Sequence, residues 1–196
     1  MPVAVTGVIL AGGRGRRMGG RDKGLAILSG RPLIEHMITA LRPQTSDLII
    51  IANRNLSSYR RYGYPVMADS LSGYLGPLAG MLTGLQQAAT EWVLVVPCDV
   101  PGLPADLVQR MITATGSPSA EVCIAHDGLR SHPVIALMNR GLEASLRDYV
   151  LAGNRRVKDW VMSRKVVIAD FSDIGGAFRN LNREDDLADA GEWILD

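Results

Sequence analysis

The chain has 196 residues, of which 47% are hydrophobic, and its formal net charge is +1 at pH 7. This length and composition are typical of one packed globular domain and argue against a disordered chain. The small net charge argues against general binding to nucleic acid or to a membrane surface, and no apolar run approaches the roughly 20 residues that cross a bilayer.

The cysteines and the N-terminal residues bear on the cellular compartment. Cys98 and Cys123 form no CxxC motif. Residues 1–4 lead straight into an apolar run, without the basic segment and cleavage site of a secretory signal. We therefore expect a cytoplasmic protein with reduced thiols.

A glycine-rich basic stretch follows the first predicted strand. Residues 3–10 form a short, β-branched apolar run that ends in glycines, which predicts a buried strand. The next stretch has one acid, Asp22, and five cations within ten positions: Arg14, Arg16, Arg17, Arg21 and Lys23. Glycines let a ligand approach the backbone, and cations neutralise a polyphosphate. The stretch predicts a phosphate-binding loop, with a solvated linker as the alternative.

Two common phosphate-binding signatures do not fit this loop. A Walker A loop needs a lysine after its second glycine, but Arg21 follows Gly20. The dinucleotide fingerprint lacks its third glycine, because Met18 stands at that position.

Strand-like and helix-like segments then alternate along the chain. Helical spacing predicts helices over residues 32–41, 56–62, 76–85, 140–151 and 155–162, and one after Asn182. Apolar runs predict strands over residues 48–52, 65–68, 92–96, 120–125, 133–138 and 166–170. The alternation predicts an α/β fold: a Rossmann-like three-layer αβα sandwich with a mostly parallel sheet and a mixed C-terminal half.

Four polar or glycine positions follow the ends of predicted strands: Gly12, Asn53, Asp69 and Asp99. Open α/β sheets bind ligands beyond the carboxyl ends of their strands. We therefore expect these four residues to share one ligand site.

Seven blocks of the chain resemble the molybdenum cofactor guanylyltransferase family, the MobA family of nucleotidyltransferases. They occur in the family's order at residues 10–23, 69–70, 76–81, 97–99, 132–133, 153–157 and 180–182. The resemblance implies transfer of GMP from GTP to the phosphate of molybdenum-molybdopterin, with pyrophosphate as the second product. It also implies a single nucleotidyltransferase domain over residues 1–196, whose halves, about 1–104 and 105–196, bind the nucleotide and the pterin.

The resemblance further implies catalytic roles for Arg17, Lys23 and Asp99. Asp99 matches the metal position, and its hard carboxylate suits Mg²⁺, with Mn²⁺ as a substitute. Arg17 and Lys23 would neutralise the triphosphate and the leaving pyrophosphate. A helix cap is the alternative for Asp99 and a surface cation for the other two, and we expect Asp22 to tether a neighbouring arginine.

The implied nucleotide-binding residues are Leu10, Ala11, Gly12, Gly13, Lys23, Asn53, Asp69, Pro77, Leu78, Gly80 and Asp99. Guanine presents adjacent N–H donors, which carbonyls, an amide or a carboxylate can accept. Whether Asn53 and Asp69 contact base or ribose stays open, and each has a turn or cap role as its alternative. The sequence Leu-Ala-Gly-Gly at residues 10–13 favours GTP, because relatives that use CTP tend to have Leu-Ala-Ala-Gly there.

The implied pterin-binding residues are His132, Pro133, Arg155, Arg156, Asn180 and Asn182. Guanidinium groups suit a phosphate-bearing acceptor, although the two arginines also fit an exposed helix start. His126, Asp127 and His132 lack the remaining ligands of a metal site, so we expect satisfied loop residues there. His36 has no partner that the sequence reveals, and Cys98 is expected to be a buried packing residue.

The expected partners are GTP and molybdenum-molybdopterin, with transient contacts to molybdopterin-supplying proteins and molybdoenzyme chaperones. We expect a monomer that binds neither nucleic acid nor membrane. A pterin cytidylyltransferase or a sugar-phosphate nucleotidyltransferase is the alternative, followed by a non-catalytic molybdopterin carrier. A carrier would not need both Lys23 and Asp99 at a triphosphate.

Overall fold

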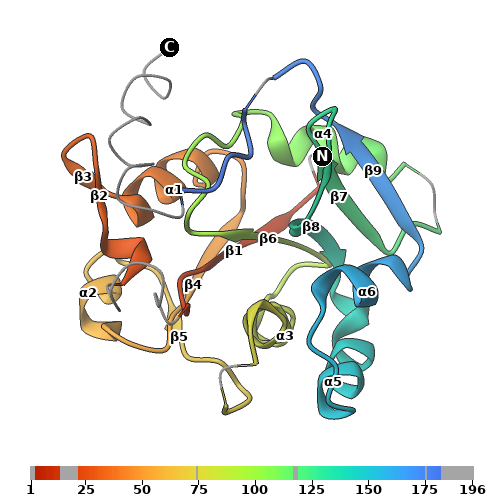
Figure 1. Cartoon of the computed structure of the whole chain (residues 1–196), viewed down its shortest axis with the longest axis horizontal. Coiled ribbons are helices and arrows are strands. Elements are labelled where there is room, and N and C mark those ends of the chain that lie inside the picture. The colour runs from red at the N-terminus through yellow and green to blue at the C-terminus, as the bar shows by residue number, and fades with distance from the viewer. Residues whose placement is uncertain (1–2, 14–21, 74, 117–118, 175, 182–196) are drawn as a thin grey trace.

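The structure is a computed structural model that describes residues 3–13, 22–73, 75–116, 119–174 and 176–181 (Figure 1). Its main feature is a seven-stranded sheet with the order β5-β4-β1-β6-β8-β7-β9. The strands are β1 (Val5–Leu10), β4 (Asp47–Ile51), β5 (Val66–Met67), β6 (Trp92–Pro97), β7 (Val122–His126), β8 (Ser131–Asn139) and β9 (Val166–Asp170).

The sheet is mostly parallel, as predicted. β1 runs parallel to both β4 and β6, β4 to β5, and β7 to β9. β8 runs antiparallel between β6 and β7, and the register of β7 against β8 shifts between Ile124 and Ala125. The prediction of a mixed C-terminal half is therefore confirmed, with β8 as the reversed strand.

Helices cover both faces of the sheet and make three layers (Figure 1). The helices are α1 (Leu33–Leu41), α2 (Leu56–Arg60), α3 (Pro77–Gln87), α4 (Leu107–Ala114), α5 (Glu143–Leu151) and α6 (Val157–Met162). α1, α2 and α4 contribute Ile34, Tyr59 and Leu107 to the core on one face. α3, α5 and α6 bury Leu82, Leu146 and Trp160 on the other. Both faces of the central strands are thus covered, which explains their continuous apolar runs.

A short hairpin, β2 (Ile27–Leu28) and β3 (Arg31–Pro32), was not among the predicted elements. Its two-residue turn, Ser29-Gly30, has positive φ at both positions, which a tight hairpin of this kind requires. The strands are too short to show an alternating pattern, so only the turn residues could have revealed them. The 3-10 turn η2 (Lys23–Leu25) leads into this hairpin.

Some predicted boundaries differ from the observed ones. Residues 140–142 form a separate 3-10 turn, η3 (Arg140–Leu142), before α5, and α6 begins at Val157 and not at residue 155. The helix predicted after Asn182 lies outside the described residues. Within the described ranges, no helix has the length and apolar character needed to cross a membrane.

Candidate functional site

A pocket of about 590 Å³ lies at the carboxyl ends of β1, β4 and β6 and beside the first turns of α3. Its lining residues come from strand ends, loops and α3: Leu10, Gly12, Gly13, Lys23, Ile51, Asp69, Gly76, Pro77, Gly80, Pro97, Cys98, Asp99 and Val134. The pocket thus occupies the place where parallel α/β sheets bind ligands.

Asn53 and Asp69 form a reciprocal pair on one side of this pocket. Asn53 Nδ2 donates to Asp69 Oδ2 at 2.7 Å, and the backbone N–H of Asp69 donates to Asn53 Oδ1 at 2.9 Å. Asn53 Nδ2 also reaches the carbonyl of Gly12 at 3.4 Å. Burial raises the pKa of the Asp69 carboxyl, and the hydrogen bond from Asn53 opposes that rise. Asn53 therefore orients Asp69 and does not itself line the pocket.

Close backbone approaches explain two of the glycines around this pair. A Cβ on Gly12 would lie 2.7 Å from Asn53 Nδ2, so a side chain there would displace the amide. A Cβ on Gly80 would lie 2.8 Å from Leu10 Cδ2 and 3.5 Å from Asp69 Oδ1. Both glycines leave room for the Asn53–Asp69 pair and for the pocket.

Lys23 and Asp99 form an ion pair in the pocket wall. Lys23 Nζ contacts Asp99 Oδ2, and the side chains are 19% and 12% exposed. Asn180 Nδ2 donates to the other carboxylate oxygen at 3.2 Å, and the backbone N–H of Leu181 donates to the Asp99 carbonyl at 2.9 Å. The structure thus brings together two predicted catalytic residues, and it places Asn180 beside them.

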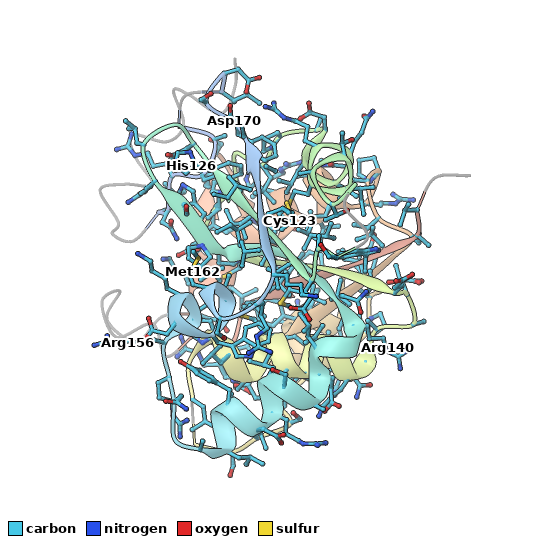
Figure 2. The ribbon with its side chains drawn as sticks, turned by 90° about the vertical axis from the view of Figure 1, so that its right-hand side faces the viewer. Cys123, His126, Arg140, Arg156, Met162 and Asp170 are labelled. Carbon is cyan, nitrogen blue, oxygen red and sulfur yellow. The ribbon has the colours of Figure 1, made fainter. Side chains whose placement is uncertain are left out.

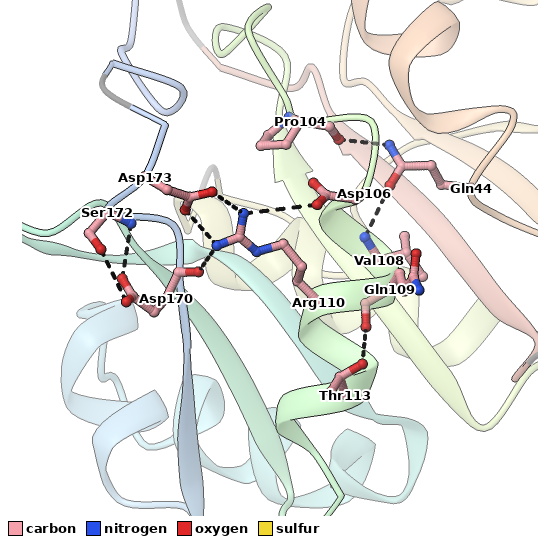
Figure 3. Close-up of polar contacts among 10 residues, drawn as sticks. All are labelled: Gln44, Pro104, Asp106, Val108, Gln109, Arg110, Thr113, Asp170, Ser172 and Asp173. Carbon is pink, nitrogen blue, oxygen red and sulfur yellow. Dashed lines mark hydrogen bonds and ion pairs between the residues drawn. The ribbon is translucent and has the colours of Figure 1, made fainter.

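The segment that carries Asn180 is anchored through α4 (Figure 3). The Arg110 guanidinium donates to both carboxylate oxygens of Asp173, at 2.6 and 3.0 Å, and to the carbonyl of Asp170. It also lies over the ring of Phe171, with Cζ 4.3 Å from the centroid. These contacts fix the chain where it leaves β9 and turns back toward the pocket.

Asp22 is held by residues of α2 and of the loop before it. Tyr59 and Asn55 donate hydrogen bonds to its carboxylate, and Arg54 Nε lies 3.8 Å from Oδ2. A tethered arginine was expected from residues 14–21, which lie outside the described residues and include the predicted catalytic Arg17. Among the described residues, the arginine beside Asp22 is Arg54, in the loop before α2 (Leu56–Arg60).

Apart from Asn53, which holds Asp69, the predicted nucleotide-binding residues divide into two groups. Leu10, Gly12, Gly13, Lys23, Asp69, Pro77, Gly80 and Asp99 line the pocket. Ala11 and Leu78 have buried side chains and do not line it, because each points into a core layer. Cys98 is a buried free thiol beside Asp99, as expected of a packing residue, although it also contributes to the pocket wall.

The predicted pterin-binding residues are not all at the pocket. His132 and Pro133 lie on β8 next to Val134, which lines it. Arg155 and Arg156 lie between α5 and α6, and Figure 2 shows Arg156 at the outer margin of the molecule near α6. The Arg155 guanidinium donates to the carbonyls of Val150 and Asn154, at 2.8 and 2.7 Å. Asn182 lies outside the described residues.

His132 is held by a carboxylate and packs against an aromatic ring. Its Nε2 lies 2.7 Å from Asp127 Oδ2, and its ring lies 5.1 Å from that of Phe178. Desolvation raises the pKa of Asp127, but hydrogen bonds from His132 and from the Arg130 and Leu129 N–H groups together lower it below its usual range. In the described part of the chain, no group of three or more His, Cys, Asp or Glu side chains is placed to hold a metal ion.

The sequence revealed no partner for His36, and the structure gives it two. Its Nε2 lies 3.0 Å from the carbonyl of Leu28, and its Nδ1 lies 3.4 Å from an Arg31 nitrogen. The partners belong to the β2–β3 hairpin, which explains why the helical pattern of α1 did not reveal them.

Five pocket residues were not predicted to bind a ligand, although three of them lie in blocks that resemble the family: Ile51, Val134, and from those blocks Gly76, Pro97 and Cys98. Ile51 and Pro97 end β4 and β6, so the strand-end rule that selected Asp99 could also have selected them. Val134 lies on the reversed strand, and its position depends on the pairing of β8 with β6, which no local pattern indicates.

Comparisons with known proteins agree with this geometry. A family model described as MobA-like NTP transferase domain matches residues 7–167. A molybdenum cofactor guanylyltransferase from Shewanella loihica is 46% identical over 194 residues, 99% of each chain.

Two solved structures share the fold. A molybdopterin-guanine dinucleotide biosynthesis protein A from Archaeoglobus fulgidus matches with a TM-score of 0.77 and 20% identity, over 95% of this chain and 97% of that one. A Mycobacterium tuberculosis protein solved in complex with manganese matches with a TM-score of 0.64 and 17% identity, over 87% and 89% of the two chains. From the family match and the full-length relative, the chain belongs to the MobA-like NTP transferase family of nucleotidyltransferases.

Proposed function

We propose that this chain is a molybdenum cofactor guanylyltransferase, which transfers GMP from GTP to the phosphate of molybdenum-molybdopterin and releases pyrophosphate. The observation that carries the proposal is one pocket whose wall holds the Lys23–Asp99 ion pair and also the Asp69 carboxylate. The relative that is 46% identical bears the name of this activity.

The Asn53–Asp69 side of the pocket would take the nucleoside. Guanine offers N1–H and N2–H₂ as neighbouring donors, and Asp69 supplies carboxylate oxygens that accept hydrogen bonds. Because Asn53 holds Oδ2, the other oxygen remains for the ligand. Gly12 and Gly13, whose heavy atoms are all backbone atoms, line the same pocket and supply further polar groups.

The Lys23–Asp99 side would take the triphosphate. Lys23 supplies positive charge directly at the pocket wall, and Arg17 is proposed to act with it on the leaving pyrophosphate. The acceptor phosphate is already an anion, so the reaction requires charge neutralisation and alignment more than a general base. An acceptor oxygen bonds to the α-phosphorus, the α–β bridging bond breaks, and pyrophosphate leaves with that electron pair.

Asp99 is the residue that would hold Mg²⁺, or Mn²⁺ in its place. One carboxylate from the pocket wall is enough for an ion whose other ligands are phosphate oxygens and water, which is how Mg²⁺ usually binds with nucleotides. The contact with Lys23 indicates that this carboxylate already accepts a cation. When bound, the ion would neutralise phosphate charge.

The C-terminal half, about residues 105–196, is proposed to bind the pterin. His132 and Pro133 precede the pocket residue Val134, and Asn180 contacts Asp99. The Arg156 side chain is 84% exposed and lies 3.9 Å from Asp159 Oδ2, so an acceptor phosphate would compete with an exposed carboxylate for its charge. Arg155 and Asn182 complete the proposed set. We further propose a cytoplasmic monomer that receives molybdopterin from a supplying protein and passes its product to molybdoenzyme chaperones.

The test is turnover of purified protein with GTP, Mg²⁺ and molybdenum-molybdopterin, followed by chromatography of the product. The proposal predicts a guanine dinucleotide and one pyrophosphate per product molecule. A cytidine product from CTP, or turnover of a sugar 1-phosphate, would assign the sister activities instead. Pterin binding without any pyrophosphate release would assign the carrier.

A further inference from the structure

A buried carboxylate lies directly before the proposed phosphate-binding lysine. The side chain of Asp22 is 4% exposed, although an isolated buried carboxylate would be costly. Tyr59 donates its phenolic O–H to Oδ1 at 2.5 Å, and Asn55 Nδ2 donates to Oδ2 at 2.9 Å. Both donors come from the loop and helix around α2, more than 30 positions along the chain. Asp22 is thus a long-range anchor.

The donors are themselves held in place. Tyr59 is fully buried in the core layer that contains α1 and α4. Asn55 has φ of 51°, and its carbonyl accepts from the N–H groups of Ser58 and Tyr59, at 2.9 and 3.3 Å. Burial, and then the hydrogen bond to Asp22, raise the pKa of the Tyr59 phenol, so it stays a donor. The anchor is therefore rigid on the α2 side.

The backbone after Lys23 lies against the same phenol. A Cβ on Gly24 would lie 2.5 Å from the Tyr59 oxygen and 3.3 Å from the ring. The N–H groups of Leu25 and Ala26 donate to the carbonyls of Asp22 and Lys23, both at 3.1 Å. The chain is therefore fixed on both sides of Lys23, by the carboxylate before it and by the close approach after it.

We infer that Asp22, Asn55 and Tyr59 are positioning residues that hold the backbone at Lys23 so that its ammonium group meets Asp99 in the nucleotide pocket. This inference rests on the proposed function, because it assigns the cluster to the triphosphate end of that site. Lysine has a long, flexible side chain, so a fixed backbone removes much of the freedom that binding would otherwise have to restrict. None of the three positioning residues lines the pocket or needs to touch the substrate.

The test is a double-mutant cycle between Tyr59→Phe and Lys23→Gln, read by calorimetric affinity for GTP with Mg²⁺. Tyr59→Phe keeps the buried ring and removes only the donor. We expect about tenfold weaker GTP binding, since small misplacements of a binding group are costly. In the Lys23→Gln background the same change should alter the affinity by less than about twofold, because the group that it positions is absent.

Tyr62→Phe is the matched control. It removes a phenolic donor from the same region, where Tyr62 donates to Glu35 Oε1 at 3.2 Å, and it should leave GTP affinity unchanged. Gly24→Ala should displace the backbone at Lys23 in a second way, because its methyl group would push against the Tyr59 oxygen. It should weaken GTP binding even if Tyr59→Phe yields no folded protein.

Two results would overturn the inference alone. One is a folded Tyr59→Phe protein, and a folded Gly24→Ala protein, that bind GTP as tightly as the wild type. The other is an equal loss from Tyr59→Phe in the wild-type and Lys23→Gln backgrounds, which would indicate general loosening of the fold. A wild-type protein that binds no GTP would instead overturn the proposed function, and this inference with it.

Discussion

Gly80→Ala adds one methyl group and should weaken nucleotide binding while changing the stability of the fold only a little. Gly80 is buried on α3 (Pro77–Gln87), between Leu10 and Asp69 in the pocket wall. Its added Cβ would lie 2.8 Å from Leu10 Cδ2, so the end of the leucine side chain would have to move, and 3.5 Å from Asp69 Oδ1. Both neighbours line the pocket, so Gly80→Ala reshapes the place proposed for the nucleoside.

Gly80→Ala has two opposing effects on the free energy of unfolding, but its effect on GTP affinity has no opposing contribution. Alanine favours the helix by about 1 kcal/mol over glycine. Extra volume in a packed site costs about 1–3 kcal/mol. The net change in unfolding free energy should thus stay within about 2 kcal/mol, or about 8 °C in the midpoint for a chain of this size. GTP affinity has no compensating gain and should fall about tenfold or more, which is about 1.4 kcal/mol.

Gly84→Ala supplies the matched control on the same helix. Its Cβ would lie 3.0 Å from both Val8 methyl groups, so it also crowds a neighbour, but Val8 is a core residue outside the pocket lining. Stability should change by a similar amount, while calorimetric GTP affinity stays within about twofold. Gly80→Ala protein that binds GTP like the wild type, or equal losses for the two variants, would refute this account of the pocket wall.

Three further outcomes follow from the same structure. Asp99→Ala should abolish metal-dependent turnover with an unchanged circular dichroism spectrum, and near-normal turnover would remove Asp99 from the mechanism. Arg156→Ala should weaken pterin binding about tenfold and leave GTP affinity unchanged, whereas the nearby Lys158→Ala should affect neither; equal losses of pterin and GTP would mean that the site is wrongly divided. The pKa of Asp127 is lowered in the fold, so its stabilisation is complete above about pH 5 and is lost as the pH falls through the unfolded pKa and then the folded one. Urea unfolding should thus show the gap between wild type and Asp127→Asn narrowing from about pH 5 to pH 2, and a constant gap would contradict the assignment.

The sequence predicted the sheet and its ligand edge well, for a simple physical reason. Strands buried on both faces must be continuous apolar runs, and chain polarity then places their following residues at one edge. That argument alone predicted a shared site for Gly12, Asp69 and Asp99, and all three line the same pocket. Asn53 does not line the pocket but donates a hydrogen bond to Asp69, which does.

Side-chain direction and long-range pairing could not be predicted in the same way. Leu78 belongs to a block that matches the family, yet it faces the core because α3 turns that side toward the sheet. Asn180 contacts Asp99 only because the chain returns after β9 (Val166–Asp170), a path anchored by Arg110 and Asp173. Asp22 accepts a hydrogen bond from Tyr59, and no local sequence pattern links residues so far apart.

The central claim is that this pocket selects GTP for guanylyl transfer, and binding calorimetry tests it most directly. GTP, CTP, ATP and UTP would each be titrated with Mg²⁺ into the wild-type protein and into Asp69→Ala. The account predicts a clear preference for GTP in the wild type and a large loss of that binding in Asp69→Ala. A preference for CTP, or GTP binding that Asp69→Ala leaves intact, would contradict it.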